Sequence, residues 1–212
     1  MDRKEIVKKL SSIYGGIGLI ALIGGFFLIL IPTIPYIWYA INPKATDQEI
    51  ERISEDILDS EDILKDSITQ SRIPEVNPEL PKDPYVKIDR IGVMSPVQKG
   101  DNYISILTNG AWMVPEFGDP INNEKTIIIA AHRFGYSYWS REERSLVSFY
   151  NLPKTDIGDI VSIIWDQREF VYEIYKGEES TYITDYDADL ILYTCKYFNS
   201  PIRIFRYARA IY

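Results

Sequence analysis

Two residue types with catalytic chemistry, histidine and cysteine, occur only once each in this 212-residue chain. His132 closes the apolar run Ile127–Ala131, and Cys195 closes the run Leu190–Thr194. Short runs of this kind, rich in β-branched residues, predict buried β-strands, whose rigid ends open onto loops. Arg203 follows near the start of the next strand-like run. A thiol, an imidazole and a guanidinium placed at strand ends are the groups of a cysteine acyl-transfer site.

Composition limits the classes of partner and cofactor. The net charge of −8 and the pI of about 4.8 argue against nucleic acid as a partner, because phosphate binding needs a basic face. A single cysteine cannot form an internal disulfide. One histidine and one cysteine on separate strands do not make a usual zinc set, so we expect no metal and no other cofactor.

The N-terminal part, residues 1–43, predicts a membrane anchor. Gly15–Ile41 carries no charged residue and is long enough to cross a bilayer as a helix. Four basic residues among the first nine place the N-terminus in the cytoplasm and the rest of the chain outside. The alternative is a cleaved signal peptide, but the apolar stretch is longer than a usual signal core and no small-x-small cleavage site is evident.

Residues 44–84 predict an acidic stalk and linker. Thr46 and Glu49 form a capping-box pattern, and isoleucines then recur at helical spacing among acidic residues up to about Gln70. Four prolines between positions 74 and 84 favour an extended linker. We interpret the segment as a solvated spacer. The alternative is a lid that packs its isoleucine stripe over the catalytic groove.

Residues 85–212 predict one all-β domain, a barrel or a sandwich. Tyr103–Leu107 fits either a strand or a short helix, and Ser140–Tyr150 is the one helix candidate, with Arg141–Arg144 on its solvated side. The predicted strands are Val86–Ile88, Ile91–Val93, Ile127–Ala131, Ile160–Trp165, Glu169–Tyr175, Ile191–Cys195 and Ile202–Tyr207.

Several motifs of this domain carry a family resemblance. Ala130-Ala131-His132-Arg133 ends one predicted strand, Leu192-Tyr193-Thr194-Cys195 ends another, and Arg203-Ile204-Phe205-Arg206 opens the last. In order and spacing, these and the segments between them resemble the sortases, the cysteine transpeptidases that attach proteins to bacterial cell walls or polymerise pilins. The resemblance covers Pro84 to the C-terminus and leaves the subclass open, with a class D or class E type as one candidate.

The resemblance implies an eight-stranded sortase-type β-barrel with short helices and a role for each site residue. Cys195 would be the nucleophile, and His132 the acid for the leaving amine and then the base for the incoming one. Arg203 would stabilise the oxyanion, and Thr194 would orient the substrate carbonyl. One departure is that Ile191 occupies the position of the first threonine in the family's cysteine signature.

The implied partners are proteins with a C-terminal sorting signal of the Leu-Pro-x-Thr-Gly type. The implied acceptor is an amine of a peptidoglycan precursor or of a pilin lysine. We also expect no C-terminal membrane helix like that of many pilin-polymerising sortases, since the last predicted strand ends close to Tyr212.

Three alternatives stay open at this point. Arg206 could replace Arg203, although strand alternation puts Arg203, Phe205 and Tyr207 on one face and Arg206 on the other. The domain could be a non-catalytic extracellular module that binds peptides or cell wall. It could also be a thiol hydrolase, because hydrolysis and transfer share the same thioester.

Overall fold

The computed structural model describes residues 14–28, 37, 41, 73–122, 125–198 and 200–211. The chain divides into two compact units, Met1–Asn42 and Pro43–Tyr212. In the first unit, residues 14–28 form a helix whose large apolar side chains are exposed, Ile20 to 72% and Leu28 to 76%. None of the helices in the described residues combines the length and hydrophobicity that membrane crossing requires. The predicted stalk helix, residues 46–70, lies outside the described residues.

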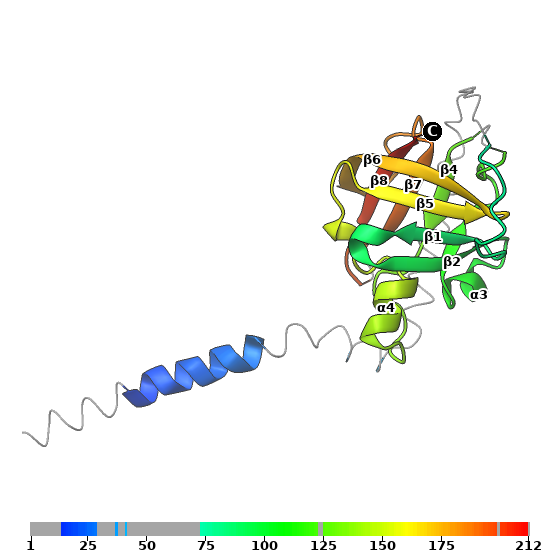
Figure 1. Ribbon diagram of the computed structural model, residues 1–212. Helices are drawn as coiled ribbons and strands as arrows, with labels where there is room; N and C mark the ends of the chain where they lie inside the picture. Colours follow the sequence, from blue (N-terminus) through cyan, green and yellow to red (C-terminus); the bar gives the residue numbers. More distant parts are fainter. Residues whose placement is uncertain are drawn as a thin grey trace, which may run out of the picture. The chain divides into compact units, whose positions relative to one another are not determined.

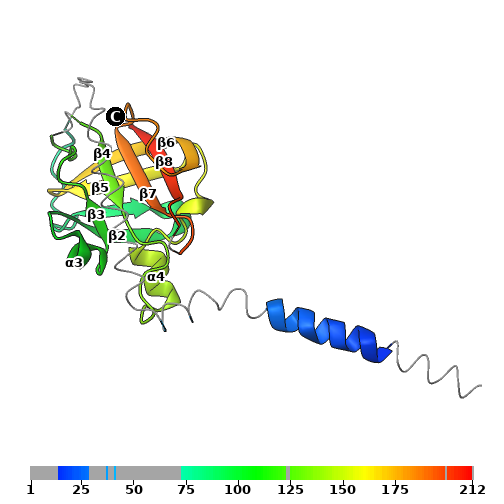
Figure 2. The same cartoon turned by 180° about the vertical axis from the view of Figure 1, so that it is seen from behind.

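The second unit contains a closed β-barrel, which confirms the predicted all-β class (Figures 1 and 2). Around the barrel the strand order is β1-β2-β3-β4-β7-β8-β6-β5. All neighbours are antiparallel except the pairs β2–β3 and β4–β7, which are parallel. The strands are β1 (Tyr85–Ile88), β2 (Val93–Lys99), β3 (Ala111–Met113), β4 (Ile127–Ala130), β5 (Ile160–Trp165), β6 (Arg168–Ser180), β7 (Leu190–Cys195) and β8 (Arg203–Ala210). The short helices are η2 (Asp89–Ile91), α3 (Tyr103–Leu107), α4 (Arg141–Val147) and η3 (Leu152–Lys154).

One predicted strand differs in the structure, and one segment that fitted either a strand or a helix is decided. The prediction of a strand at Ile91–Val93 was wrong, because Asp89–Ile91 forms a 3₁₀ turn and β2 begins only at Val93. Gly92 ends this turn with a φ of 70°, a left-handed conformation that glycine adopts without a side-chain clash. Tyr103–Leu107 is a helix, and the side chain of Asn102 caps it by accepting a hydrogen bond from the Ser105 backbone.

One strand and one extension were not among the predicted strands. Ala111–Met113 forms β3, whose three residues are all buried. A strand of three residues is too short to show alternation. In addition, β6 continues to Ser180, past a bulge between Ile174 and Lys176 that shifts its register against β8. Such bulges interrupt the apolar–polar alternation on which the sequence prediction depended.

Two hydrophobic cores occupy the two faces of the strand pair β4–β7. The first core fills the barrel interior and includes Leu190 and Leu192 of β7. The second lies on the outer face and includes Ile191, Tyr193 and Cys195 of the same strand. All six residues of β7 are therefore buried. Burial on both faces explains why the run is continuously apolar instead of alternating.

The outer core is covered by α3, by the segment after β3 and by the loop between β6 and β7. Elsewhere, α4 begins with a capping box between Ser140 and Glu143. It packs against β2, where Ser95 donates a hydrogen bond of 2.7 Å to the carbonyl of Val147 (Figures 1 and 2). His132, after the end of β4, and Cys195, at the end of β7, are both buried.

Part of the predicted linker is bound to the barrel. Gln167, in the turn between β5 and β6, donates hydrogen bonds to the carbonyls of Pro78 and Leu80, at 3.2 and 3.1 Å. Arg168 donates to the carbonyl of Pro74 at 3.1 Å. The last part of residues 44–84 thus lies against the domain that follows it.

Candidate active site

Strand register brings Cys195 and Arg203 together. Cys195 is the last residue of β7, Arg203 the first of β8, and the two are direct partners in this antiparallel pair. Cross-strand partners project from the same face of a sheet at close spacing. For Cys195 this is the outer face, since it belongs to the outer core together with Phe205 and Tyr207.

His132 follows the end of β4, which pairs in parallel with β7. The last register pair is Ala130 with Tyr193, and the Ala131 amide donates to the Tyr193 carbonyl at 3.3 Å. Extending this register by two residues brings His132 level with Cys195. The imidazole also packs edge-on against Tyr136, with ring centroids 5.6 Å apart. Three side chains that are distant in sequence are thus carried by neighbouring strand ends.

Thr194 lies next to Cys195 but belongs to the opposite face by alternation. Its hydroxyl is buried and donates a hydrogen bond of 2.8 Å to the carbonyl of Ala131. This bond joins the residue before the cysteine to the residue before the histidine.

The candidate site is enclosed by the protein. Cys195 is 0% exposed, and His132 and Arg203 are each 1% exposed. Phe134, after β4, stacks on Phe198, after β7, with ring centroids 4.2 Å apart and planes at 30°. This aromatic pair connects the loop that follows the histidine to the loop that follows the cysteine.

Arg144 organises the loop after His132 and was missed by sequence reasoning, which treated it as a solvated residue of the helix. Its side chain is only 4% exposed and donates to three carbonyls of the loop. These belong to Phe134, to Tyr136 at 3.0 Å and to Trp139 at 3.5 Å. No signal in the sequence distinguishes Arg144 from Arg141, because only the fold determines which side of a short helix is covered.

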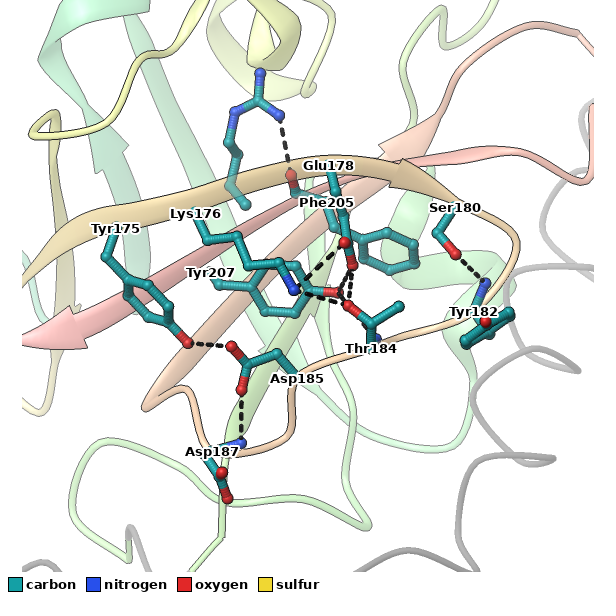
Figure 3. Close-up of polar contacts among 11 residues, drawn as sticks. Tyr175, Lys176, Glu178, Ser180, Tyr182, Thr184, Asp185, Asp187, Phe205 and Tyr207 are labelled. Atoms are coloured by element: carbon teal, nitrogen blue, oxygen red, sulfur yellow. Dashed lines mark hydrogen bonds and ion pairs between the residues drawn. The ribbon is translucent and has the colours of Figure 1, made fainter.

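A polar network holds the loop between β6 and β7 against the outer face of the barrel, as Figure 3 shows. The Thr184 amide donates to the Tyr207 hydroxyl at 3.1 Å, and that hydroxyl donates to Glu178 at 2.6 Å. Lys176 forms an ion pair with Glu178 at 3.3 Å and lies over the Tyr207 ring, 4.6 Å from its centroid. Tyr175 of β6 also donates to Asp185 of the loop at 2.8 Å.

The electrostatics of this network follow from burial and from its donors. Burial tends to raise the pKa of Glu178, but hydrogen bonds from Thr184 and Tyr207 and the charge of Lys176 hold that pKa below its ordinary value. Burial and the bond to Glu178 raise the pKa of Tyr207. The network is therefore anionic at the carboxylate and neutral at the phenol at neutral pH.

Arg206 points to the opposite face from Arg203, as the alternation predicted. It donates to the Thr155 hydroxyl at 2.7 Å and to the carbonyls of Pro153 and Thr155 at 3.2 and 3.3 Å. With Gly177 it lines a separate cavity of about 290 Å³. Its contacts anchor the segment before β5 and do not involve the cysteine.

Within the part of the chain that the structure describes, no group of three or more histidine, cysteine or acidic residues is arranged to hold a metal ion. Of the aspartates in the loop before β7, Asp185 accepts from Tyr175 and from the Asp187 amide, and Asp189 accepts from the Ala210 amide.

Several solved structures that are similar to this chain are sortases. Sortase C1 of Streptococcus agalactiae in complex with MTSET is 18% identical with a TM-score of 0.50, over 62% of this chain and 70% of that chain. Sortase D5 of Clostridium perfringens is 18% identical with a TM-score of 0.48, over 82% and 99%. The lid mutant of sortase A from Corynebacterium diphtheriae is 16% identical with a TM-score of 0.48, over 62% and 71%.

A search of curated protein sequences found no match. The family model of the sortase domain, however, matches residues 86–211, which is more than half of the chain and includes all the candidate site residues. The match begins at the second residue of β1 and extends past the end of β8, so it covers all of the barrel except Tyr85. The chain therefore belongs to the sortase family, the cysteine transpeptidases.

Proposed function

We propose that this sortase is a membrane-anchored transpeptidase that cleaves a sorting signal of the Leu-Pro-x-Thr-Gly type through a thioester on Cys195. The observation that carries the proposal is the placement of Arg203 as the register partner of Cys195, beside the strand end that carries His132. A nucleophile, a proton carrier and a permanent cation at one end of the barrel supply the parts of an acyl transfer.

In the first half-reaction, the Cys195 thiolate attacks the carbonyl carbon of the threonine in the signal. A carbon–sulfur bond forms, and the carbonyl π electrons move to oxygen, giving a tetrahedral oxyanion. Arg203 donates N–H groups to this oxyanion. When the intermediate collapses, the carbon–nitrogen bond breaks and protonated His132 gives its proton to the leaving amine.

In the second half-reaction, an acceptor amine attacks the thioester. Neutral His132 takes a proton from the amine as the carbon–nitrogen bond forms. Collapse then breaks the carbon–sulfur bond and regenerates the thiolate. The acceptor is an amine of a peptidoglycan precursor or of a pilin lysine. Thr194 acts from the opposite face of β7, where its bond to the Ala131 carbonyl holds together the strand ends that carry Cys195 and His132.

The anchor is the N-terminal segment, with the N-terminus in the cytoplasm and the catalytic domain outside the cell. The helix over residues 14–28 supports this placement, because its large apolar side chains are exposed around its circumference. Apolar side chains are more stable in contact with lipid than with water. The basic residues that precede it suit the cytoplasmic surface.

The proposal is tested by intact mass spectrometry of the full chain in detergent after mixing with a panel of sorting-signal peptides. We expect an acyl adduct that hydroxylamine removes and that is absent from Cys195→Ala. The adduct mass identifies the cleaved bond. A Cys195→Ala variant that still joined peptide to amine would refute the mechanism.

The alternative function is a non-catalytic module that binds peptides or cell wall on a membrane stalk. The complete burial of Cys195 and the near-complete burial of His132 favour it, because neither side chain meets solvent in this conformation. Peptide binding without turnover, unchanged when Cys195, His132 and Arg203 are all replaced, would establish this alternative. Analysis of the products with and without an added amine separates transfer from hydrolysis.

A further inference from the structure

The side chain of Arg133 connects the two strand ends that carry the candidate site. Arg133 follows His132 directly, and its Nη1 atom donates a hydrogen bond to the carbonyl of Lys196, the residue after Cys195. The guanidinium also lies over the ring of Phe134, 5.1 Å from the centroid. One cation thus reaches from the residue beside the histidine to the residue beside the thiol.

One N–H donor of the Arg133 guanidinium has no acceptor among the described residues. Its Nε atom is buried and, among the described residues, has no hydrogen-bond partner. Native structures rarely leave a buried donor of a charged group unsatisfied, because nothing then offsets the desolvation of that group. A nearby atom that becomes negatively charged during the reaction would supply the missing interaction.

The titratable groups that interact electrostatically with Arg133 include the thiol of Cys195. Burial lowers the pKa of Arg133, and negative charge on Tyr150, Tyr197, Glu179 and Cys195 acts in the opposite direction. The interaction is mutual, so a charge pair that favours ionised arginine also favours ionised cysteine. Other charged or titratable groups described at these strand ends include His132 with its ring contact Tyr136, Arg203, and Lys196, which is paired with Glu179.

We propose that Arg133 is a second guanidinium of the active site, which stabilises the thiolate of Cys195 and holds its strand end against that of His132. The inference rests on the proposed function, since it takes Cys195 as the nucleophile. The thiolate is the reactive form of cysteine, so a permanent positive charge nearby increases the reactive fraction at neutral pH. Arg133 acts on the sulfur through its charge and through the Lys196 carbonyl, and it is therefore a positioning residue.

The ionisation of this thiol can be measured whether or not a reagent reaches it. Cys195 is the only cysteine in the sequence, so cysteine labelled with ¹³C at Cβ gives one resonance whose shift follows the thiol. The full chain in detergent is titrated as the parent, as Arg133→Gln, as Arg133→Lys and as Arg141→Gln. The last variant is the matched control, because it removes the same charge from an exposed position on α4.

We expect Arg133→Gln to lower the ratio of thiolate to thiol, at any pH below the pKa, by about three- to tenfold, the size of a partly screened charge pair. Arg133→Lys keeps the charge and should stay within about twofold of the parent by the same reasoning. Arg141→Gln should match the parent. A purely structural role would change the unfolding midpoint of Arg133→Gln and leave the thiol pKa unmoved, which would overturn the inference.

Arg133→Lys decides the question if Arg133→Gln does not fold. A ratio of thiolate to thiol within about twofold of the parent supports the charge role. A ratio lowered as far as is expected for Arg133→Gln overturns it. Acylation by sorting-signal peptides tests the proposed function separately. A parent that forms the thioester while Arg133→Gln keeps its thiol pKa contradicts only the inference. If Arg133→Gln raises the thiol pKa but the parent forms no adduct with any peptide, only the proposed function is contradicted.

Discussion

Thr194 and Ala131 are joined across two parallel strands by a hydrogen bond of 2.8 Å from the threonine hydroxyl to the alanine carbonyl. Thr194 precedes Cys195, and Ala131 precedes His132. The bond therefore couples the two strand ends at the point where the nucleophile and the proton carrier leave the sheet. Because the bond is buried, its loss leaves the carbonyl desolvated and without its donor.

Thr194→Val tests this coupling, since valine keeps the shape and removes the hydroxyl. We expect the free energy of unfolding to fall by about 1–3 kcal/mol, the cost of a buried unsatisfied group. If the hydroxyl positions the strand ends, the rate of acylation falls and KM stays unchanged. A raised KM with unchanged stability would instead support direct substrate binding. Thr194→Ser, which keeps the hydroxyl, is the control for urea unfolding and for kinetics.

Arg203 and Arg206 provide a matched pair on one strand. Arg203→Lys should reduce the acylation rate about 10²- to 10³-fold, the effect of losing one oxyanion donor. Arg206→Lys should retain activity and lower the unfolding midpoint, because lysine cannot reproduce the bonds to Thr155 and Pro153. Single-turnover mass spectrometry and thermal unfolding measure the two effects. The reverse pattern would assign the catalytic role to Arg206.

Arg144→Met should destabilise the loop that follows His132. The variant leaves the carbonyls of Phe134 and Tyr136 without their charged donor, and hydrogen bonds to charged groups contribute about 1.5–3 kcal/mol. Arg141→Met, at an exposed position of the same helix, should change stability by less than about 0.5 kcal/mol. Urea unfolding compares the two variants. If both substitutions lowered the free energy of unfolding equally, the hydrogen bonds of Arg144 to the loop would not account for the loss.

Phe198→Ala should open the enclosed thiol to solvent. The substitution removes the stacking partner of Phe134, so the loop after Cys195 is held to the loop after His132 less firmly, by the Arg133 bond to Lys196 without the aromatic pair. We expect Cys195 to react several times faster with a small neutral alkylating reagent at fixed pH. Tyr138→Ala, at a side chain that is 71% exposed, is the control. An unchanged alkylation rate in Phe198→Ala would mean that other contacts control access.

The stability that Glu178 contributes at the loop between β6 and β7 should depend on pH. Its folded pKa lies below the ordinary value of 4.5, so its ionised form stabilises the fold. This contribution is fully present above pH 4.5 and is lost as the pH falls through the lower folded pKa. Glu178→Gln should therefore be less stable than the parent near neutrality, and the difference should disappear in acid. A difference that persisted unchanged below the folded pKa would refute the assignment.

Much of the barrel was predictable from local patterns. The apolar runs that became β4 and β7 are continuous because both faces of these strands are buried, and burial of that kind is visible in the sequence. Tyr103–Leu107 was ambiguous, since a five-residue apolar run fits both periods and the Asn102 cap decides for the helix. Strand β3 was missed because three residues are too few to show a period, and only its pairing with β2 and β4 defines it.

The sequence by itself determined the residue types of the site, the family and the face of the last strand on which Arg203 lies. Those properties follow from local alternation and from short motifs. The tertiary structure decided which groups meet. Register across β4, β7 and β8 places Cys195 beside Arg203, and chain folding turns Arg144 inward and brings Arg133 to the Lys196 carbonyl. Such contacts join residues from different strands and loops, so no local pattern in the sequence can specify them.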